Sequence, residues 1–261
     1  MTRLGHYEVV RQIGEGGFAR TYEARHIYLD EKACLKQNIN LSPSDTELLR
    51  REAKLLWRVH HHSLPSTRDF FQAEDGSTIL AMSFIEGRTL NKIIEKHKAL
   101  HPEEVAWIMQ RLLNALHYLH SLGIIHGDVK PPNVIVQPEV HNAVLVDYGL
   151  ASLLPTRKSK AVGYTPVFVA PEIIEGNPPL PESDLYAVGL TMIYTLGGDP
   201  IAKTFPSWVP EPMQEFCKEL VRYDPMERPN WSKQDLIARL SDIRLEAFGR
   251  RSTLEKLVEK K

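Results

Sequence analysis

A glycine-rich segment near the start of the chain has the residue types needed to hold a polyphosphate. GEGGFA occupies residues 14–19, and small side chains let backbone N–H groups close over phosphate oxygens. The same composition is also typical of a simple hairpin turn, so the segment alone leaves both interpretations open. We expect no helix directly after the glycines, and the segment therefore does not fit a dinucleotide-binding site.

Lys36 and Glu52 carry opposite charges in surroundings that are otherwise apolar. Lys36 lies in the apolar run ACLKQ, so its ammonium must either reach water or meet an anion. Glu52 shares one face of a predicted helix with Leu48, Leu55 and Val59, and a buried carboxylate needs a cation. We therefore predict an ion pair between Lys36 and Glu52, which would orient the lysine to bind the α and β phosphates of a nucleotide.

Two later segments, IIHGDVKPPNVIV and LVDYGLA, resemble two conserved motifs of one protein family. HGDVKPPN resembles the catalytic loop HRDxKxxN of eukaryotic-type (Hanks-type) protein serine/threonine kinases, and DYG resembles their metal-binding DFG motif. The glycine-rich segment, the ACLK lysine and APE at 170–172 fit the same family, over roughly residues 7–240. The runs ARTYEA and ACLKQ look more like bacterial members of the family than animal ones.

The resemblance implies a role for each matched residue in moving the γ-phosphate of ATP to a serine or threonine hydroxyl of a protein. Asp128 would orient the hydroxyl and accept its proton, and Lys130 would neutralise charge on the γ-phosphate. Thr165 matches the threonine that bonds this aspartate and lysine. Asn133 and Asp147 offer hard oxygen ligands that, with the phosphates, suit Mg²⁺ or Mn²⁺. The implied catalytic set is Asp128, Lys130, Lys36, Glu52 and Thr165.

The resemblance also implies an ATP-binding surface. Met82 would be the gatekeeper, and residues 83–85 would form the hinge whose backbone bonds adenine. Thr21, Cys34 and Val136 would line the adenine slot, although a packed apolar cysteine is equally expected from the residue type alone. The implied ATP-binding residues are Ile13, Gly14, Glu15, Gly16, Gly17, Phe18, Thr21, Cys34, Lys36, Met82, Ser83, Ile85 and Val136.

Other matches are architectural. Glu172 and Arg228 would form a buried ion pair that ties APE to the later helices, and Asp184 would bond the backbone of the catalytic loop. Ala19 stands at the usual third glycine and adds only a methyl group. Tyr148 replaces the usual phenylalanine of DFG and adds a hydroxyl that needs a partner if it is buried.

One departure from the family concerns regulation. Family members carry an arginine before the catalytic aspartate, which binds a phosphorylated residue of the activation loop; this chain has Gly127 there and Ala161 at the usual acceptor position. We therefore predict a loop that reaches its working shape without phosphorylation at that position. Thr156 and Ser159 stay open as autophosphorylation sites.

These residues need a scaffold of strands followed by helices. The first 83 residues alternate short apolar runs with Gly, Asp and Glu, a pattern typical of twisted antiparallel strands. One helix should interrupt them, opening at Ser42 with Pro43 in its first turn and Asp45 completing a variant of the capping box.

From about Thr89 the periodicity becomes helical, with short strands expected in NVIVQ and AVLVDY and an apolar helix expected to begin near Asp184. The expected fold is α+β, a two-lobed protein kinase fold. Its N-lobe, residues 1–83, would hold an antiparallel sheet and one main helix. Residues 84–242 would form a mainly helical C-lobe, and residues 243–261 a charged helical tail.

Composition excludes several broad classes of partner. The 261 residues include 32 Lys plus Arg and 33 Asp plus Glu, so no global field favours nucleic acid or an acidic membrane. Cys34 and Cys217 give neither a disulfide framework nor a metal-ligand spacing, which favours a reducing, cytoplasmic location. We expect no membrane span, because no apolar run approaches roughly 18 to 20 residues.

Three alternatives remain beside the protein-kinase interpretation. Small-molecule phosphotransferases of the aminoglycoside and choline type also use HGD, but they usually lack the equivalents of Lys130 and APE. A pseudokinase would use the fold only to bind partners, although it usually loses a catalytic residue. Metal binding by His60–His62, or by His117 with His120, would need more convergent ligands. The sequence leaves the protein substrate and the oligomeric state unspecified.

Overall fold

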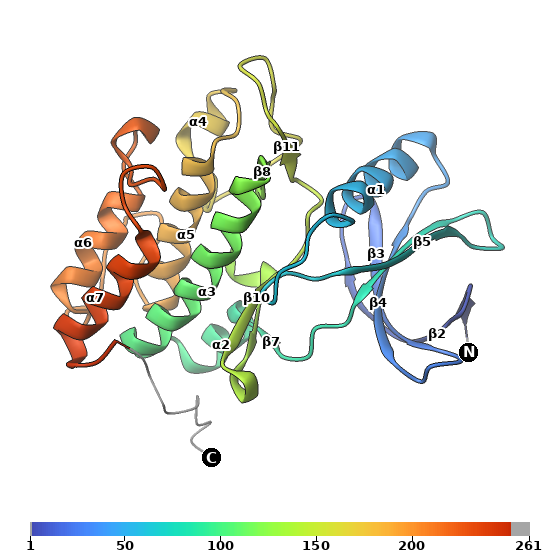
Figure 1. Cartoon of the computed structure of the whole chain (residues 1–261), viewed down its shortest axis with the longest axis horizontal. Coiled ribbons are helices and arrows are strands. Elements are labelled where there is room, and N and C mark those ends of the chain that lie inside the picture. The colour runs from blue at the N-terminus through green and yellow to red at the C-terminus, as the bar shows by residue number, and fades with distance from the viewer. Residues whose placement is uncertain (1, 252–261) are drawn as a thin grey trace. The chain divides into compact units, whose positions relative to one another are not determined.

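The computed structural model describes residues 2–251. The chain divides into two compact units, Met1–Glu86 and Gly87–Lys261, which are described separately below (Figure 1). The predicted N-lobe, residues 1–83, falls within the first unit.

The first unit contains an antiparallel sheet of six strands in the order β1-β2-β3-β4-β6-β5. Its core is a cluster of apolar side chains that includes Tyr7, Ala24, Leu35 and Ile79. The strands are β1 (Arg3–Leu4), β2 (Tyr7–Glu15), β3 (Ala19–His26), β4 (Lys32–Asn38), β5 (Thr67–Gln72) and β6 (Thr78–Ser83).

The single helix of this unit is α1 (Pro43–Leu56), which packs against β4, β5 and β6. Its start follows from local chemistry, because the hydroxyl of Ser42 accepts a hydrogen bond from the backbone N–H of Asp45 at 3.1 Å. The predicted helix and its cap are confirmed. The predicted face is only partly correct, because the helix ends at Leu56, before Val59, and Leu48 is half-buried. The buried residues of the helix are Leu49, Glu52, Ala53, Leu55 and Leu56.

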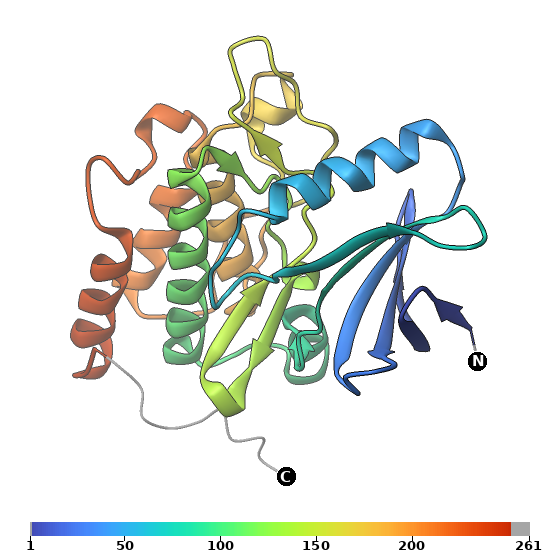
Figure 2. The ribbon, with the colours of Figure 1, turned by 45° about the vertical axis from the view of Figure 1, so that its right-hand side comes forward.

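The second unit is mainly helical, and α3 and α5 lie at its centre (Figures 1 and 2). α3 packs against α5, α7 and β10, and α5 also packs against α6. The helices are α2 (Leu90–His97), α3 (Pro102–Ser121), α4 (Pro171–Ile174), α5 (Pro181–Thr195), α6 (Glu211–Leu220) and α7 (Leu236–Phe248), with short 3₁₀ turns at η1 (Pro131–Asn133), η2 (Pro138–Val140) and η3 (Pro225–Glu227).

Short strands position the loops of this unit. β9 (Val134–Gln137) pairs with β10 (Asn142–Leu145) and with β7 (Arg88–Thr89), while β11 (Ser152–Leu153) pairs with β8 (Ile124–Ile125). The two predicted strands are confirmed, but the second ends at Leu145. Asp147 has a φ of 68°, a left-handed conformation that a strand does not accept.

Two helix boundaries differ from the expectation. α5 begins at Pro181 rather than near Asp184, because proline is well tolerated in the first turn of a helix. α7 runs through residue 242 and ends at Phe248, followed by Gly249, whose φ of 72° is typical of the residue after a helix. Residues 252–261 of the predicted tail lie outside the described part of the chain.

The expected fold class is confirmed: an antiparallel sheet with one helix, followed by a mainly helical unit. Among residues 2–251, no helix is both long enough and apolar enough to cross a membrane.

Candidate active site

The predicted ion pair of the first unit is present. Lys36 Nζ on β4 donates to both carboxylate oxygens of Glu52 on α1, at 2.9 and 2.8 Å. Both side chains are buried, with 10% and 2% of their surface exposed. The ammonium also lies 5.3 Å from the centre of the Phe18 ring, so this cation has an aromatic as well as an anionic neighbour.

Four predicted ligand-binding residues of this unit lie on one face of the sheet. Thr21 on β3 is the cross-strand partner of Lys36, and Cys34 on β4 is the partner of Met82 on β6. Residues two apart on a strand point to the same side, as do directly paired residues. Thr21, Cys34 and Met82 therefore share the face from which Lys36 meets Glu52.

Ser83, the first residue of the predicted hinge, is held by two hydrogen bonds to Ser66. Ser83 N donates to Ser66 O at 2.9 Å, and Ser66 N donates to the Ser83 hydroxyl at 3.0 Å. Ile85 follows and is half-buried. Val136, the remaining predicted lining residue, is buried in β9 of the second unit.

The glycine-rich segment forms the hairpin between β2 and β3, with Gly16 N donating to Ala19 O at 2.9 Å. Gly16 and Gly17 both have ordinary φ values. A Cβ at Gly16 would meet no atom closer than 3.9 Å, and one at Gly17 would meet none within 4 Å. The fold of this unit therefore does not itself require glycine here, and the bare backbone leaves room for a ligand.

In the second unit, Asp128 is held at both carboxylate oxygens. Oδ1 accepts from the Thr165 hydroxyl at 2.7 Å, and Oδ2 lies 2.8 Å from Lys130 Nζ. Lys130 also donates to the Thr165 hydroxyl at 2.7 Å, and Asn133 Nδ2 donates to Oδ2 at 2.9 Å. The predicted contacts of Thr165 are confirmed, and the carboxylate has a fixed orientation.

Asn133 and Asp147 have the donor atoms for a divalent cation. The amide nitrogen of Asn133 is committed to Asp128, which leaves Oδ1 as the atom able to coordinate. Val146 N donates to Asn133 O at 2.9 Å, which anchors the residue before the exposed Asp147 to the backbone of Asn133. Two oxygen ligands from the protein suit Mg²⁺, which usually binds one or two protein oxygens together with phosphates.

Asp184 connects α5 to the loop that carries Asp128, as predicted. Its oxygens accept from His126 N and Gly127 N, both at 2.8 Å, and from His120 Nε2 at 2.8 Å. Burial alone would raise the pKa of Asp184, yet the hydrogen bonds and the nearby imidazoles hold that pKa below its usual value. Burial lowers the pKa of His126, whose ring packs edge-on against Tyr148 at 4.9 Å.

Trp231 completes this chain of contacts, although no pattern in the sequence predicted it. Its indole Nε1 donates to His120 Nδ1 at 2.8 Å. Because an indole can only donate, Nδ1 must accept, and His120 therefore carries its proton on Nε2 toward Asp184. His117 stacks on the same indole at 4.7 Å. Within residues 2–251, no group of three or more His, Cys, Asp or Glu side chains could hold a metal ion.

Gly127 has a φ of 75°, and a Cβ there would lie 2.9 Å from Leu150 O. A side chain at this position would therefore be strained in this conformation. Gly127 and Ala161 line one cavity of about 30 Å³ together with Asp128, Leu150 and other residues. The two positions that depart from the family pattern thus line the same cavity.

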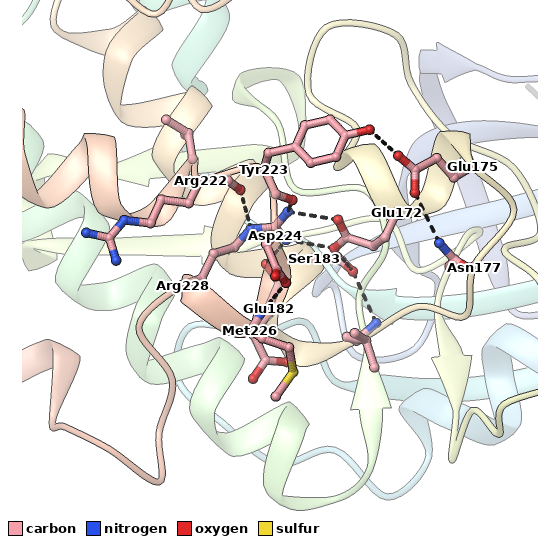
Figure 3. Close-up of polar contacts among 12 residues, drawn as sticks. Glu172, Glu175, Asn177, Glu182, Ser183, Arg222, Tyr223, Asp224, Met226 and Arg228 are labelled. Atoms are coloured by element: carbon pink, nitrogen blue, oxygen red, sulfur yellow. Dashed lines mark hydrogen bonds and ion pairs between the residues drawn. The ribbon is translucent and has the colours of Figure 1, made fainter.

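The Glu172–Arg228 ion pair is also present, and Figure 3 shows its surroundings. Arg228 Nη1 and Nη2 donate to the two Glu172 oxygens at 2.7 and 2.8 Å. Ser183 Oγ donates to Glu172 at 2.7 Å. Burial alone would raise the pKa of Glu172, but the hydrogen bonds from Arg228 and Ser183 hold that pKa below its usual value.

The comparisons with known proteins match this chain to protein kinases. A family model described as "Protein kinase domain" matches residues 7–236. Serine/threonine-protein kinase pkn3 of Myxococcus xanthus is 34% identical over 74% of this chain and 38% of its own length. PrkC of Bacillus subtilis is 28% identical over 86% of this chain and 38% of its own length. Serine/threonine-protein kinase D of Synechocystis is 34% identical over 74% of this chain and 41% of its own length. The chain thus matches less than half the length of each of these relatives.

Proposed function

The chain belongs to the protein kinase domain family, and from this premise we propose that it transfers the γ-phosphate of ATP to serine and threonine hydroxyls of proteins. The observation that carries the proposal is the geometry of Asp128. Its carboxylate is held by Thr165, Lys130 and Asn133 at 2.7 to 2.9 Å. A base fixed at both oxygens is what oriented proton transfer needs.

Asp128 would hold the acceptor hydroxyl and take its proton as the oxygen bonds to phosphorus and the bond to ADP breaks. Lys130, 2.8 Å from this carboxylate, would neutralise charge on the phosphoryl group in transit. Thr165 bonds both side chains and would keep the cation and the base together. These tasks consist of positioning and charge neutralisation, which dominate catalysis of this reaction.

Lys36, oriented by Glu52, would bind the α and β phosphates. Asn133 Oδ1 and the Asp147 carboxylate would hold Mg²⁺, which supplies charge neutralisation at the phosphate oxygens when bound. The bare backbone at Gly16 and Gly17 would cover the phosphates, and the face that bears Cys34 would receive adenine. A sequence with only two cysteines, far apart, favours a reducing cytoplasmic setting.

The activation loop would need no phosphate at the usual position. A side chain at Gly127 would crowd Leu150 O, since even a Cβ there would lie 2.9 Å from it, and Ala161 on the same cavity has no hydroxyl to phosphorylate. We expect phosphatase-treated protein to keep full transfer activity, measured as initial rate with a protein substrate. Loss of activity after phosphatase treatment, with a phosphosite mapped near Ala161, would contradict this part of the proposal.

The proposed function is tested by transfer from γ-labelled ATP to generic protein substrates and, in parallel, to small alcohols such as choline and an aminoglycoside. We expect label on serine and threonine residues, in amounts that fall to background with EDTA or with Asp128→Asn. Label only on small molecules would favour the small-molecule phosphotransferase. Binding of ATP and Mg²⁺ without any label would favour the pseudokinase.

A further inference from the structure

A cluster of basic side chains lies on the loop between β11 and α4, in the second unit. We call Arg157, Lys158 and Lys160 the basic turn. All three residues are exposed, and no ion pair to them is found among residues 2–251. Residues 148–171 contain no aspartate or glutamate, so the loop itself offers these cations no partner.

The basic turn has a defined shape. Ser159 N donates to Thr156 O at 2.9 Å, and Thr156 N donates to the Ser159 hydroxyl at 2.8 Å. Lys158 N lies 3.3 Å from the Thr156 hydroxyl. Both hydroxyls are therefore engaged inside the turn, and the loop that carries it projects away from the helices of its unit in Figures 1 and 2. Because the backbone of the turn is already ordered, only its basic side chains lose conformational entropy when they bind an anion.

The basic turn is connected directly to the catalytic aspartate. Lys160 precedes Ala161, which lines the same cavity as Asp128. Thr165, further along the same loop, donates to the Asp128 carboxylate at 2.7 Å. A chain whose hydroxyl reached Asp128 would therefore pass beside this loop.

We propose that the basic turn selects protein substrates that carry aspartate or glutamate residues close to the acceptor serine or threonine. The inference rests on the proposed function and names its substrate class. Exposed charge pairs contribute little individually and are weakened by salt. Selection therefore depends on two or three simultaneous contacts, and the preference should fade as ionic strength rises.

The test compares two peptides with the same acceptor serine, one flanked by glutamates and the other by glutamines, with ATP and Mg²⁺ and the full chain. At low salt we expect a KM about tenfold lower for the glutamate peptide. The variant R157Q/K158Q/K160Q should lose this difference and keep kcat/KM for the glutamine peptide. The control K92Q/K98Q/K218Q removes the same charge from exposed positions on α2, after α2 and on α6, and it should keep the difference.

Equal KM values for the two peptides in the unmodified chain would overturn the inference. So would an equal loss of preference in the control variant. A third contrary result is a preference for the glutamate peptide that survives in R157Q/K158Q/K160Q while that variant loses binding to duplex DNA or to anionic vesicles. Absence of label from both peptides and from generic proteins would instead overturn the proposed function, and this inference with it.

Discussion

Two buried ion pairs, Lys36–Glu52 in the first unit and Arg228–Glu172 in the second, use different cations, an ammonium on a flexible stem and a planar guanidinium. Lys36 joins one strand to one helix through its two bonds to Glu52. Arg228 uses all five of its N–H donors: two go to Glu172, and the others go to the backbone oxygens of Arg222, Tyr223 and Glu182 at 2.8 to 3.0 Å. The guanidinium therefore binds three segments of the chain at once.

The difference indicates separate tasks for two similar pairs. Arg228 has an unexposed side chain, and its planar fork is satisfied by the protein alone, so it serves the fold. Lys36 lies on a sheet face beside residues proposed to bind ATP, and an ammonium on a flexible stem suits a ligand that comes and goes. Loss of Arg228 should therefore affect stability first, whereas loss of Lys36 should affect transfer first.

The largest expected effect is on folding. Arg228→Ala leaves Glu172 buried without its cation and deprives three backbone oxygens of a donor. We expect the free energy of unfolding to fall by about 3–5 kcal/mol, measured by urea denaturation. Arg239→Ala is a matched control, because its pair with Glu219 is more exposed at both side chains; its cost should stay near or below about 1 kcal/mol. Equal losses in the two variants would contradict the assigned role of Arg228.

The second effect is on transfer. Lys36→Met should lower the rate of γ-phosphate transfer by about 10²- to 10³-fold, because an oriented cation at the phosphates is lost. Its free energy of unfolding should fall by less than that of the Arg228→Ala variant, since the Arg228 side chain also bonds three backbone oxygens. Transfer assays and urea denaturation of the same preparation measure both quantities. A variant that keeps its transfer rate would show that the pair is only structural.

The smallest expected effect is a pH dependence. Since the pKa of Glu172 is lowered in the folded chain, its ion pair stabilises the fold fully above the ordinary carboxyl pKa of about 4.3. That contribution is lost as pH falls through the lowered pKa. The stability difference between the unmodified chain and Glu172→Gln should therefore shrink below pH of about 4. It is measured by urea denaturation across pH, and a difference that stays constant would contradict the assignment.

Sequence alone predicted contacts whose partners have strong chemical reasons to meet. Glu52 in an apolar helical stripe needed a cation, and Lys36 in an apolar strand needed an anion, so their pairing followed from charge and burial. The contacts of Asp128, Thr165 and Arg228 followed from the family resemblance, because they join motifs far apart in the chain.

Other features depend on tertiary packing and could not be predicted in this way. Trp231 and His120 are separated by 111 residues, and neither residue type demands the other. The end of β10 is set by the left-handed backbone of Asp147, which hydrophobic alternation does not record. Strands of two residues such as β8 and β11 are too short to produce a periodic pattern.

The central claim, that Asp128 is the base for phosphoryl transfer, is tested most directly by single-turnover transfer from ATP in Asp128→Asn. We expect the rate to fall by about 10²- to 10⁴-fold while ATP affinity, measured on the same protein, stays within about twofold. Asp242→Asn, an exposed carboxylate on α7, should change neither quantity. Transfer by Asp128→Asn at the rate of the unmodified chain would contradict the account.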